Sequence, residues 1–280
     1  MAFASTSTAR PRRGRAAALL GAGVRSAAKQ AAGVVAQATL PQCDYSRALF
    51  LFGHMRCGST ALANVLCSRP EISGYGEAHI AYRDRAALGR LAVNQHLRSA
   101  YRPKARYLFD KVLHSRYDAA ADPALFQARA VFLVRAPAPA IHSIRTLFAR
   151  IGSAEYPTDA AAAAYYEERL EQLARLWAAF PSDRRLGISF EGLTAAPCAF
   201  LALLSAMLGL DPPLQNQYEP RVLRTAHGAG DPLSSHRFAS IVPAAHSTSL
   251  ERNVPALDVP AGQLSRLERL YEHLRNLFAG

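Results

Sequence analysis

The chain has 280 residues, half of them hydrophobic, and a formal net charge of +12. At this length it can bury a substantial core as one large or two small domains. No apolar run reaches the ~18 residues of a membrane span. There is also no zinc-ligand spacing, aromatic RNA-binding motif or lysine cluster, so we expect no nucleic-acid partner. Six positive charges precede the first acidic residue, at Arg10, Arg12, Arg13, Arg15, Arg25 and Lys29.

The first 42 residues are rich in Ala, Arg, Ser and Gly and contain no acidic residue. We predict that residues 1–42 form a basic, disordered tail and that residues 43–280 form a single domain. Residues 16–24 resemble a signal-peptide core only superficially, because they are weakly hydrophobic. The four cysteines show no C-x-x-C pair, as is usual in a reducing compartment. We therefore expect a cytoplasmic protein.

Residues 49–52 form a short, uninterrupted apolar run, typical of a strand that is buried on both faces. Glycines follow at positions 53 and 58, and the periodic apolar segment 60–66 predicts a helix. A glycine-bearing loop between a strand and a helix favours anion binding, because the helix N-terminus offers unpaired N–H groups and a positive dipole end. The simpler alternative is a glycine turn that only connects the two elements.

The glycine spacing matches the nucleotide-triphosphate loop G-x-x-x-x-G-K-[ST] with one difference. Ser59 stands where that loop has its lysine, and the nearest cation is Arg56, inside the loop. Because the lysine normally reaches the transferring phosphates, its loss argues against ordinary ATP or GTP hydrolysis.

The next elements bring a glutamate and one of the few lysines to strand ends. Residues 72–75 predict a short second strand, and Glu77 follows it directly. Residues 83–101 read as helical, and residues 106–114 predict a third strand that carries Lys111. The chain has only three lysines, which favours a function for Lys111 over the alternative of a side chain that extends from an apolar strand into solvent.

A fourth apolar strand, residues 130–134, ends at Arg135, and Ser143 follows in a predicted helix. A guanidinium can fork onto a phosphate, and a serine hydroxyl can add a hydrogen bond. The alternative is a surface cation and a serine that faces solvent.

Further helices are predicted at residues 159–180, 200–210 and 263–278, with a strand and a capped helix within residues 185–197. Strands that alternate with helices and read as continuous apolar runs predict an α/β fold with a mostly parallel sheet, covered on both faces.

The loop sequence Arg-Cys-Gly-Ser-Thr, from Arg56 to Thr60, resembles the 5′-phosphosulfate loop of sulfotransferases that use 3′-phosphoadenosine 5′-phosphosulfate (PAPS). Its motif style is closest to the tyrosylprotein, carbohydrate-type and bacterial enzymes. The resemblance implies a P-loop NTPase-like sulfotransferase fold. It also implies transfer of a sulfuryl group, without a metal, to a hydroxyl of a carbohydrate, tyrosyl peptide or small metabolite.

The resemblance also implies roles for individual residues. The segments His227–Pro232 and Ser234–Arg237 resemble a late loop that closes over the nucleotide. The catalytic residues would be Glu77, Lys111, Arg56 and His114. The residues that bind PAPS would be Arg56, Cys57, Gly58, Ser59, Thr60, Ala61, Arg135 and Ser143.

Three residues are candidates for the base: Glu77, His79 and His114. Histidine has the more suitable unperturbed pKa, but the Gly-Glu context of Glu77 after the short second strand resembles that of the tyrosylprotein and carbohydrate-type enzymes, which favours Glu77 over His114. We expect partial burial to raise the pKa of Glu77 toward neutrality, which would make it a competent base. The position of Cys57 in the loop predicts a lowered thiol pKa. Two other classes remain open: a kinase-like enzyme with an atypical loop, and a nucleotide-binding module without catalysis.

Overall fold

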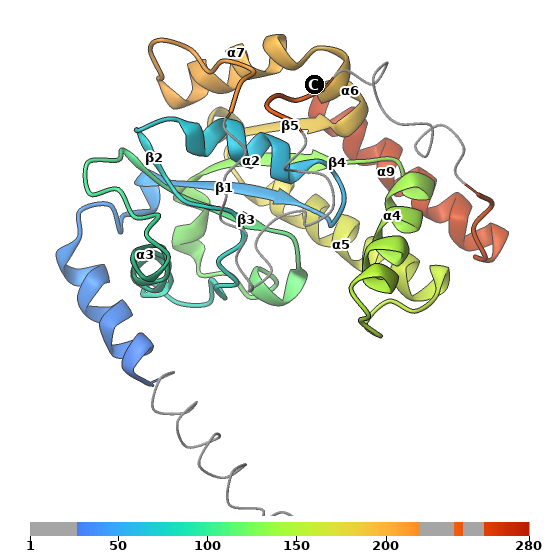
Figure 1. The fold of residues 1–280 in the computed structure, drawn as a ribbon, viewed down its shortest axis with the longest axis horizontal. Coiled ribbons are helices and arrows are strands. Elements are labelled where there is room, and N and C mark those ends of the chain that lie inside the picture. Colours follow the sequence, from blue (N-terminus) through green and yellow to red (C-terminus); the bar gives the residue numbers. More distant parts are fainter. Residues whose placement is uncertain (1–26, 219–237, 243–254, 280) are drawn as a thin grey trace, which may run out of the picture.

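The computed structural model describes residues 27–218, 238–242 and 255–279 (Figure 1). Its centre is a five-stranded sheet in the order β2-β3-β1-β4-β5, in which every neighbouring pair is parallel. The strands are β1 (Ala48–Gly53), β2 (Ile72–Ser73), β3 (Tyr107–Val112), β4 (Arg129–Val134) and β5 (Arg185–Ser189). The predicted α/β architecture with a parallel sheet is confirmed.

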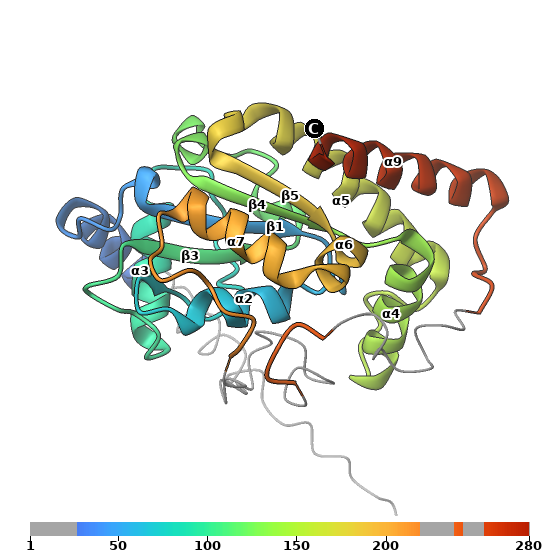
Figure 2. The ribbon, with the colours of Figure 1, turned by 90° about the horizontal axis from the view of Figure 1, so that it is seen from above.

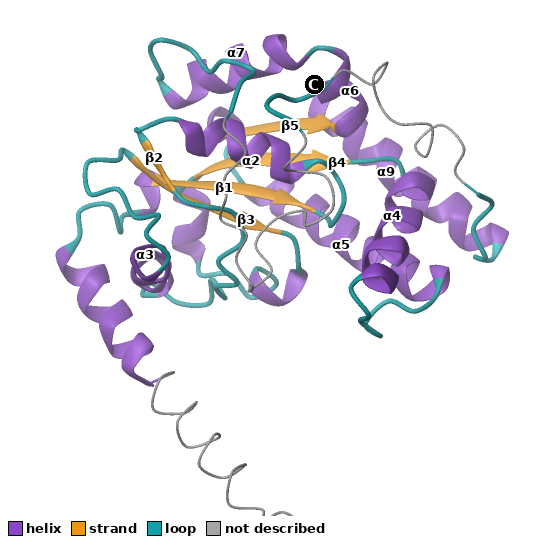
Figure 3. Cartoon of the chain, in the orientation of Figure 1, coloured by secondary structure: helices purple, strands orange, loops and turns teal. Residues whose placement is uncertain are grey.

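Helices cover both faces of the sheet, as Figures 2 and 3 show. One face is covered by α2 (Ser59–Ser68), α6 (Phe190–Ala195) and α7 (Pro197–Leu208). The other is covered by α3 (Ala87–Leu97), α4 (Pro137–Arg150), α5 (Asp159–Ala179) and α9 (Ala261–Ala279). The described connections contain the 3₁₀ helices η1 (Tyr45–Arg47), η2 (Ser115–Tyr117), η3 (Pro123–Gln127) and η4 (Ser182–Arg184).

Strand β1 lies in the middle of the sheet, and its side chains alternate between the two cores. Phe50 and Phe52 enter the core on the α3 and α5 side. Leu49 and Leu51 enter the core on the α2 and α7 side. All four side chains are fully buried, each worth about 1.5–3 kcal/mol of transfer free energy. Burial on both faces explains why the run is apolar without interruption.

The sheet order changes direction at β1, with β3 and β2 on one side and β4 and β5 on the other. In open parallel sheets, ligands bind beyond the carboxyl ends of the strands at such a switch point. Phe52 is in register with Val112 of β3, and Gly53 with Leu133 of β4. The loops that follow these three strands therefore begin at the same edge.

Residues 27–39 form a helix that packs on α3 (Figure 1). The backbone N–H of Gly89 donates to Gln37 Oε1 at 3.0 Å. A Cβ on Gly89 would lie only 1.9 Å from the carbonyl oxygen of Gly33, so the two helices meet through glycines. The expected disorder is thus wrong for residues 27–39, because small residues allow close backbone contact where bulky apolar side chains are scarce. Residues 1–26 lie outside the described residues.

Two other predictions concern element boundaries. α3 begins at Ala87 and ends at Leu97, so it is shorter than the predicted helix 83–101, and Ser99 just beyond it has a φ of 53°. The two segments within residues 227–237 that resemble a late loop lie outside the described residues. Within the described ranges, every helix is too short or too polar to cross a membrane.

We expect Gly89→Ala to detach the helix of residues 27–39 from α3. Alanine would favour α3 itself by about 1 kcal/mol, but its Cβ would overlap the Gly33 carbonyl, which is backbone and cannot rotate away. Hydrogen–deuterium exchange should show faster exchange of residues 27–39 in the variant. Gly262→Ala is the control, since a Cβ there meets no atom within 4 Å. Unchanged protection in Gly89→Ala would contradict the close crossing.

Candidate active site

The loop between β1 and α2 has the backbone shape of an anion site. β1 ends at Gly53 and α2 begins at Ser59. The backbone between them has positive φ at Arg56 (65°) and at Gly58 (90°). Gly58 is the N-cap of α2, and no side chain caps the helix by a hydrogen bond. The first amides of α2 and its positive dipole end therefore face the loop.

Phe190 joins this loop to the neighbouring cation. A Cβ on Gly58 would lie 2.6 Å from Cδ2 of Phe190, so both the positive φ and the close contact require glycine. The Arg135 guanidinium lies over the same ring, with Cζ 4.4 Å from its centroid. This cation–π contact holds Arg135 beside the loop.

Lys111 reaches the start of α2 from the adjacent strand β3. Its Nζ lies 3.3 Å from Thr60 Oγ1 and 3.2 Å from Glu77 Oε1. The Lys111 side chain is only 2% exposed. The alternative of a lysine that extends into solvent is therefore wrong. The neighbouring strand places a cation at the first turn of α2, where the loop itself has Ser59.

Glu77 is an ionised carboxylate whose two oxygens contact Lys111 and His79. Burial alone would raise its pKa, but Lys111, His79 and His114 outweigh burial and lower the pKa to about 2. Glu77 Oε2 also lies 3.3 Å from Nε2 of His79. The expected rise of the Glu77 pKa is therefore wrong, because the partner lysine was not visible from the local sequence.

His114 and His79 flank this ion pair. Burial lowers the pKa of His114 to about 4, against the opposing charge of Glu77, so this ring is neutral at pH 7. The His114 ring packs against Tyr165 at 5.3 Å, and the His79 ring stacks on Tyr117 at 5.5 Å between centroids. The structure thus brings all three base candidates to one region of the carboxyl edge.

Arg56, Arg135 and Ser143 form a second cluster at this edge. Arg56 Nε donates to Ser143 Oγ at 2.9 Å. Arg135 is 7% exposed and donates from its guanidinium to the Arg56 carbonyl at 3.2 Å. The alternative of a surface cation at Arg135 is therefore wrong. The two arginines and the serine come from the loop and from the end of β4 with the following α4.

The remaining loop residues differ in exposure. Cys57 and Ser59 are buried, whereas Thr60 and Ala61 are half-buried in the first turn of α2. Burial raises the pKa of the Cys57 thiol, and hydrogen bonds from Ser59 offset only part of this effect. The expected lowering of the Cys57 pKa is therefore wrong, because the side chain points into the core.

His54, which the sequence analysis did not single out, fixes the loop to β4. Its Nε2 accepts a hydrogen bond from the backbone N–H of Arg135 at 2.9 Å. The ring proton therefore sits on Nδ1, which lies 2.8 Å from the Met55 carbonyl and donates to it. Burial lowers the pKa of His54 to about 3, so the ring is neutral and keeps this tautomer.

Arg169 and Asp118 were also missed. Arg169 lies in the middle of α5 with a fully buried side chain and pairs with both carboxylate oxygens of Asp118, at 2.9 and 2.8 Å. It also donates to the carbonyls of Gly53 at 2.8 Å and Val112 at 2.9 Å. Its position within the apolar stripe of a helix was the available signal, since a charge there needs a partner.

Asp110 positions the Glu77–Lys111 pair from behind. Its Oδ1 accepts from the backbone N–H groups of Ala78 (2.8 Å) and Lys111 (2.9 Å), and its Oδ2 accepts from the Tyr82 hydroxyl at 2.6 Å. Burial raises the pKa of Asp110 to about 7, although these hydrogen bonds oppose the shift. Since Ala78 follows Glu77 directly, Asp110 fixes the backbone on both sides of the ion pair.

Replacing Asp110 by Asn should remove one component of the pH dependence of stability. A carboxyl whose pKa rises from 3.8 to about 7 on folding stabilises the fold at low pH. That contribution is complete below about pH 4 and is lost as pH rises to about 7, at about 1.4 kcal/mol per pH unit. The free energy of unfolding of the wild type, minus that of Asp110→Asn, should fall over this window. Urea unfolding at a series of pH values measures it.

Asparagine preserves the acceptor oxygen for the two amides, and the Tyr82 hydroxyl can accept from its Nδ2. Groups such as His114 titrate in both proteins and cancel in the difference. A difference that does not change with pH would contradict the raised pKa of Asp110.

A strand–loop–helix at the switch point of a parallel sheet, with a cation from the next strand, defines a protein of the P-loop-like class. Among the described side chains, no group of three or more His, Cys, Asp or Glu residues is placed to hold a metal ion.

Comparisons with known proteins agree with this class. Residues 87–213 match the family model described as "Sulfotransferase family". The structure is similar to the sulfotransferase domain from the Synechococcus PCC 7002 olefin synthase, with a TM-score of 0.53 and 19% identity. That similarity covers 80% of this chain and 94% of the domain. The family match and the fold confirm the predicted resemblance to the sulfotransferase family, with its P-loop NTPase-like fold.

Two further solved structures are similar at lower scores. The sulfotransferase domain from the curacin biosynthetic pathway has a TM-score of 0.48 and 16% identity, over 80% of this chain and 96% of that one. The sulfotransferase from Alicyclobacillus acidocaldarius has a TM-score of 0.42 and 15% identity, over 82% and 90%. No curated protein matches the chain significantly by sequence. The family match includes Lys111, Arg135 and Ser143 and begins after the loop and Glu77.

Proposed function

We propose that this protein transfers a sulfuryl group from PAPS to a hydroxyl of a carbohydrate, a tyrosyl peptide or a small metabolite. The observation that carries the proposal is the position of Lys111, whose Nζ lies 3.3 Å from Thr60 Oγ1 at the start of α2. The cation is supplied by β3 rather than by the loop, where Ser59 replaces the lysine of nucleotide-hydrolysing enzymes. The sulfotransferase family match supports the same conclusion.

The two clusters at the carboxyl edge suit the two phosphate groups of the donor. The loop residues 56–61 and the N-terminus of α2 would bind the 5′-phosphosulfate through backbone N–H groups and hydroxyls. Cys57 would contribute its backbone alone, since its side chain is buried. Arg135 and Ser143 would bind the 3′-phosphate, because a guanidinium and a hydroxyl together match its oxygens.

The transfer is an in-line displacement. The acceptor oxygen forms a bond to sulfur while the bond between sulfur and the 5′-phosphate oxygen breaks. The acceptor proton goes to the base, and 3′,5′-bisphosphoadenosine leaves. Lys111, Arg56 and the amides of α2 stabilise the charge that develops on the sulfuryl group and the leaving phosphate. The proposal assigns no metal. The cytoplasmic location stays a prediction from composition.

Glu77 is the proposed base, with His114 as the alternative. Glu77 is ionised at neutral pH and lies 3.2 Å from Lys111, which would contact the transferring group. It can therefore accept a proton beside the reacting atoms. His114 is neutral and is also able to accept a proton, but its ring packs between Tyr165 and Tyr117.

We expect 3′,5′-bisphosphoadenosine to raise the melting temperature without magnesium and far more than ATP does.

Arg135→Ala should weaken binding of the bisphosphate by about 1.5–3 kcal/mol, the range for hydrogen bonds to charged groups. Binding of 5′-AMP, which lacks the 3′-phosphate, should hardly change. Isothermal titration calorimetry gives both affinities, and Arg150→Ala, an exposed residue at the end of α4, is the matched control.

An equal loss of affinity for the bisphosphate and for 5′-AMP would show that Arg135 supports the structure of the site and does not bind the 3′-phosphate. ATP binding that requires magnesium, with no response to the bisphosphate, would replace the proposal by a kinase with an atypical loop. Bisphosphate binding without sulfuryl transfer to any acceptor in a broad screen would favour a binding module.

Glu77→Gln should lower turnover by roughly 10²–10⁴-fold while the affinity for the bisphosphate stays near that of the wild type. Glutamine is nearly isosteric and can still accept a hydrogen bond from Lys111, but it cannot take a proton. Radiolabelled sulfuryl transfer measures turnover, and His114→Gln is the parallel variant. Normal turnover in Glu77→Gln together with a loss in His114→Gln would move the assignment to His114.

A further inference from the structure

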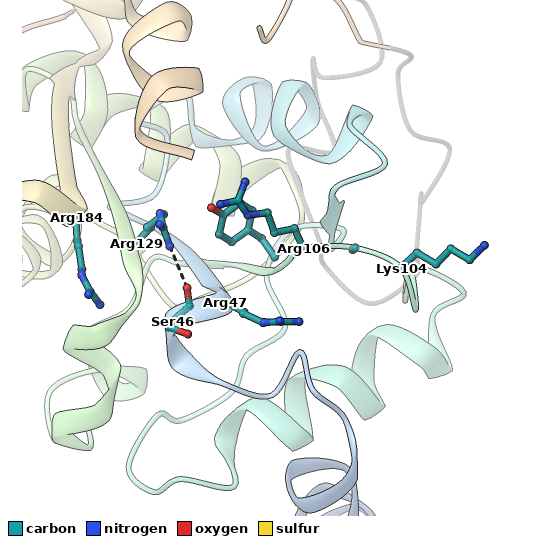
Figure 4. Close-up of a pocket in the computed structure, with 8 residues that line it drawn as sticks. Ser46, Arg47, Lys104, Arg106, Arg129 and Arg184 are labelled. Carbon is teal, nitrogen blue, oxygen red and sulfur yellow. Dashed lines mark hydrogen bonds between the residues drawn. The ribbon is translucent and has the colours of Figure 1, made fainter. Parts of the chain in front are cut away.

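A basic pocket lies at the amino edge of the sheet, opposite the loop and Lys111 (Figure 4). Its volume is about 510 Å³, within the range of small-molecule sites. The residues come from the segments just before β1, β3, β4 and β5, or from the first positions of those strands. The cations that line it are Arg47, Lys104, Arg106, Arg129 and Arg184.

Two of these arginines are held in place around the buried ring of Tyr107. The Cζ atoms of Arg106 and Arg129 each lie 5.2 Å from the ring centroid. Figure 4 shows the Arg106 and Arg129 side chains, together with that of Arg47 from the end of η1. Arg129 donates to the Ser46 carbonyl at 3.0 Å, which fixes its guanidinium at the pocket wall. The site is therefore partly organised before any ligand binds.

The positions of two of these cations, Arg106 and Arg129, are explained by their hydrogen bonds to the end of α7. Arg129 donates to the carbonyl of Met207 at 3.2 Å, and Arg106 to that of Gly209 at 3.2 Å. Both carbonyls belong to the C-terminal end of α7, where cations are favourable. Arg47 and Lys104, by contrast, are exposed, and the described residues offer their side chains no hydrogen bond or ion pair.

The charge of the pocket is poorly balanced by acidic residues. Across the described part of the chain, the carboxylate within 4.0 Å of any of the five cations is that of Asp183, 3.9 Å from Arg184 and 77% exposed. The backbone carbonyls that accept from the arginines carry no net charge. Cations gathered around one pocket repel each other and destabilise the fold unless an anion joins them.

We propose that this pocket binds a small polyanion that carries two or more phosphate or sulfate groups. Guanidinium groups fork onto the oxygens of such groups, and several arginines suit several anionic groups at once. The site is separate from the phosphate loop, because the two edges lie on the order of 20 Å apart, the length of a six-residue strand. The proposal goes beyond the proposed transferase activity, and its test uses no sulfuryl donor.

The test titrates the full chain with inorganic tripolyphosphate and, in a separate arm, with sucrose octasulfate, by calorimetry at low ionic strength. We expect at least one of the two to bind and to raise the melting temperature, and the better probe identifies the preferred anion. Arg47→Gln/Arg106→Gln should weaken that binding at least about tenfold, because it removes two charge-assisted contacts. Without ligand, the double variant should unfold at a similar temperature, since less repulsion offsets the loss of the hydrogen bond from Arg106 to Gly209 and of its contact with the Tyr107 ring.

The control is Arg150→Gln/Arg269→Gln, which removes the same charge from exposed positions on α4 and α9. Its affinity should stay within about twofold of the wild type. If the double pocket variant does not fold, Arg47→Gln alone replaces it, with a smaller loss that still exceeds that of Arg150→Gln. No binding of either probe at millimolar concentration overturns the proposal. So does an equal loss in the control, or a loss in Arg135→Ala instead, which would place the anion at the loop.

Discussion

One buried guanidinium joins the carboxyl ends of the two paired strands that carry the candidate site. Arg169 of α5 donates to the Gly53 carbonyl at the end of β1 and to the Val112 carbonyl at the end of β3. Gly53 precedes the loop between β1 and α2, and Val112 follows Lys111 directly. Arg169 therefore links the carboxyl ends of two strands that the backbone pairing of the sheet already holds side by side. Asp118 balances the charge, and both side chains of this pair are fully buried.

This ion pair is expected to matter more for geometry than for net stability. Taking two charges out of water offsets most of their attraction, and replacing such a pair by apolar residues is often neutral. Removing one partner costs about 3–5 kcal/mol, because the other charge stays buried without compensation. His54 and Asp110 also act mainly on geometry. Each ties the backbone of one element to the next with hydrogen bonds that a shifted strand would break.

The sequence predicted what depends on local pattern and failed where distant partners decide. The apolar run 49–52, the glycines at 53 and 58 and the alternation of strands and helices were enough for the fold and for the position of the loop. The predicted direction of the Glu77 pKa shift was wrong because that direction depends on Lys111, which comes from another strand. The role of Arg169 was not predicted, because nothing near α5 in the sequence shows that its partners are Asp118 and two strand-end carbonyls.

In the proposed reaction, the Lys111–Glu77 pair would couple the donor to the base. While Lys111 neutralises Glu77, that carboxylate has a pKa of about 2 and is a weak base. A sulfuryl group near Thr60 would draw the ammonium toward itself, since Nζ already lies 3.3 Å from Thr60 Oγ1. A longer distance from Nζ to Glu77, together with the negative charge of a bound donor, would weaken the stabilisation of the carboxylate, and burial would then raise the Glu77 pKa. A base that strengthens only when the donor is bound needs no separate conformational switch.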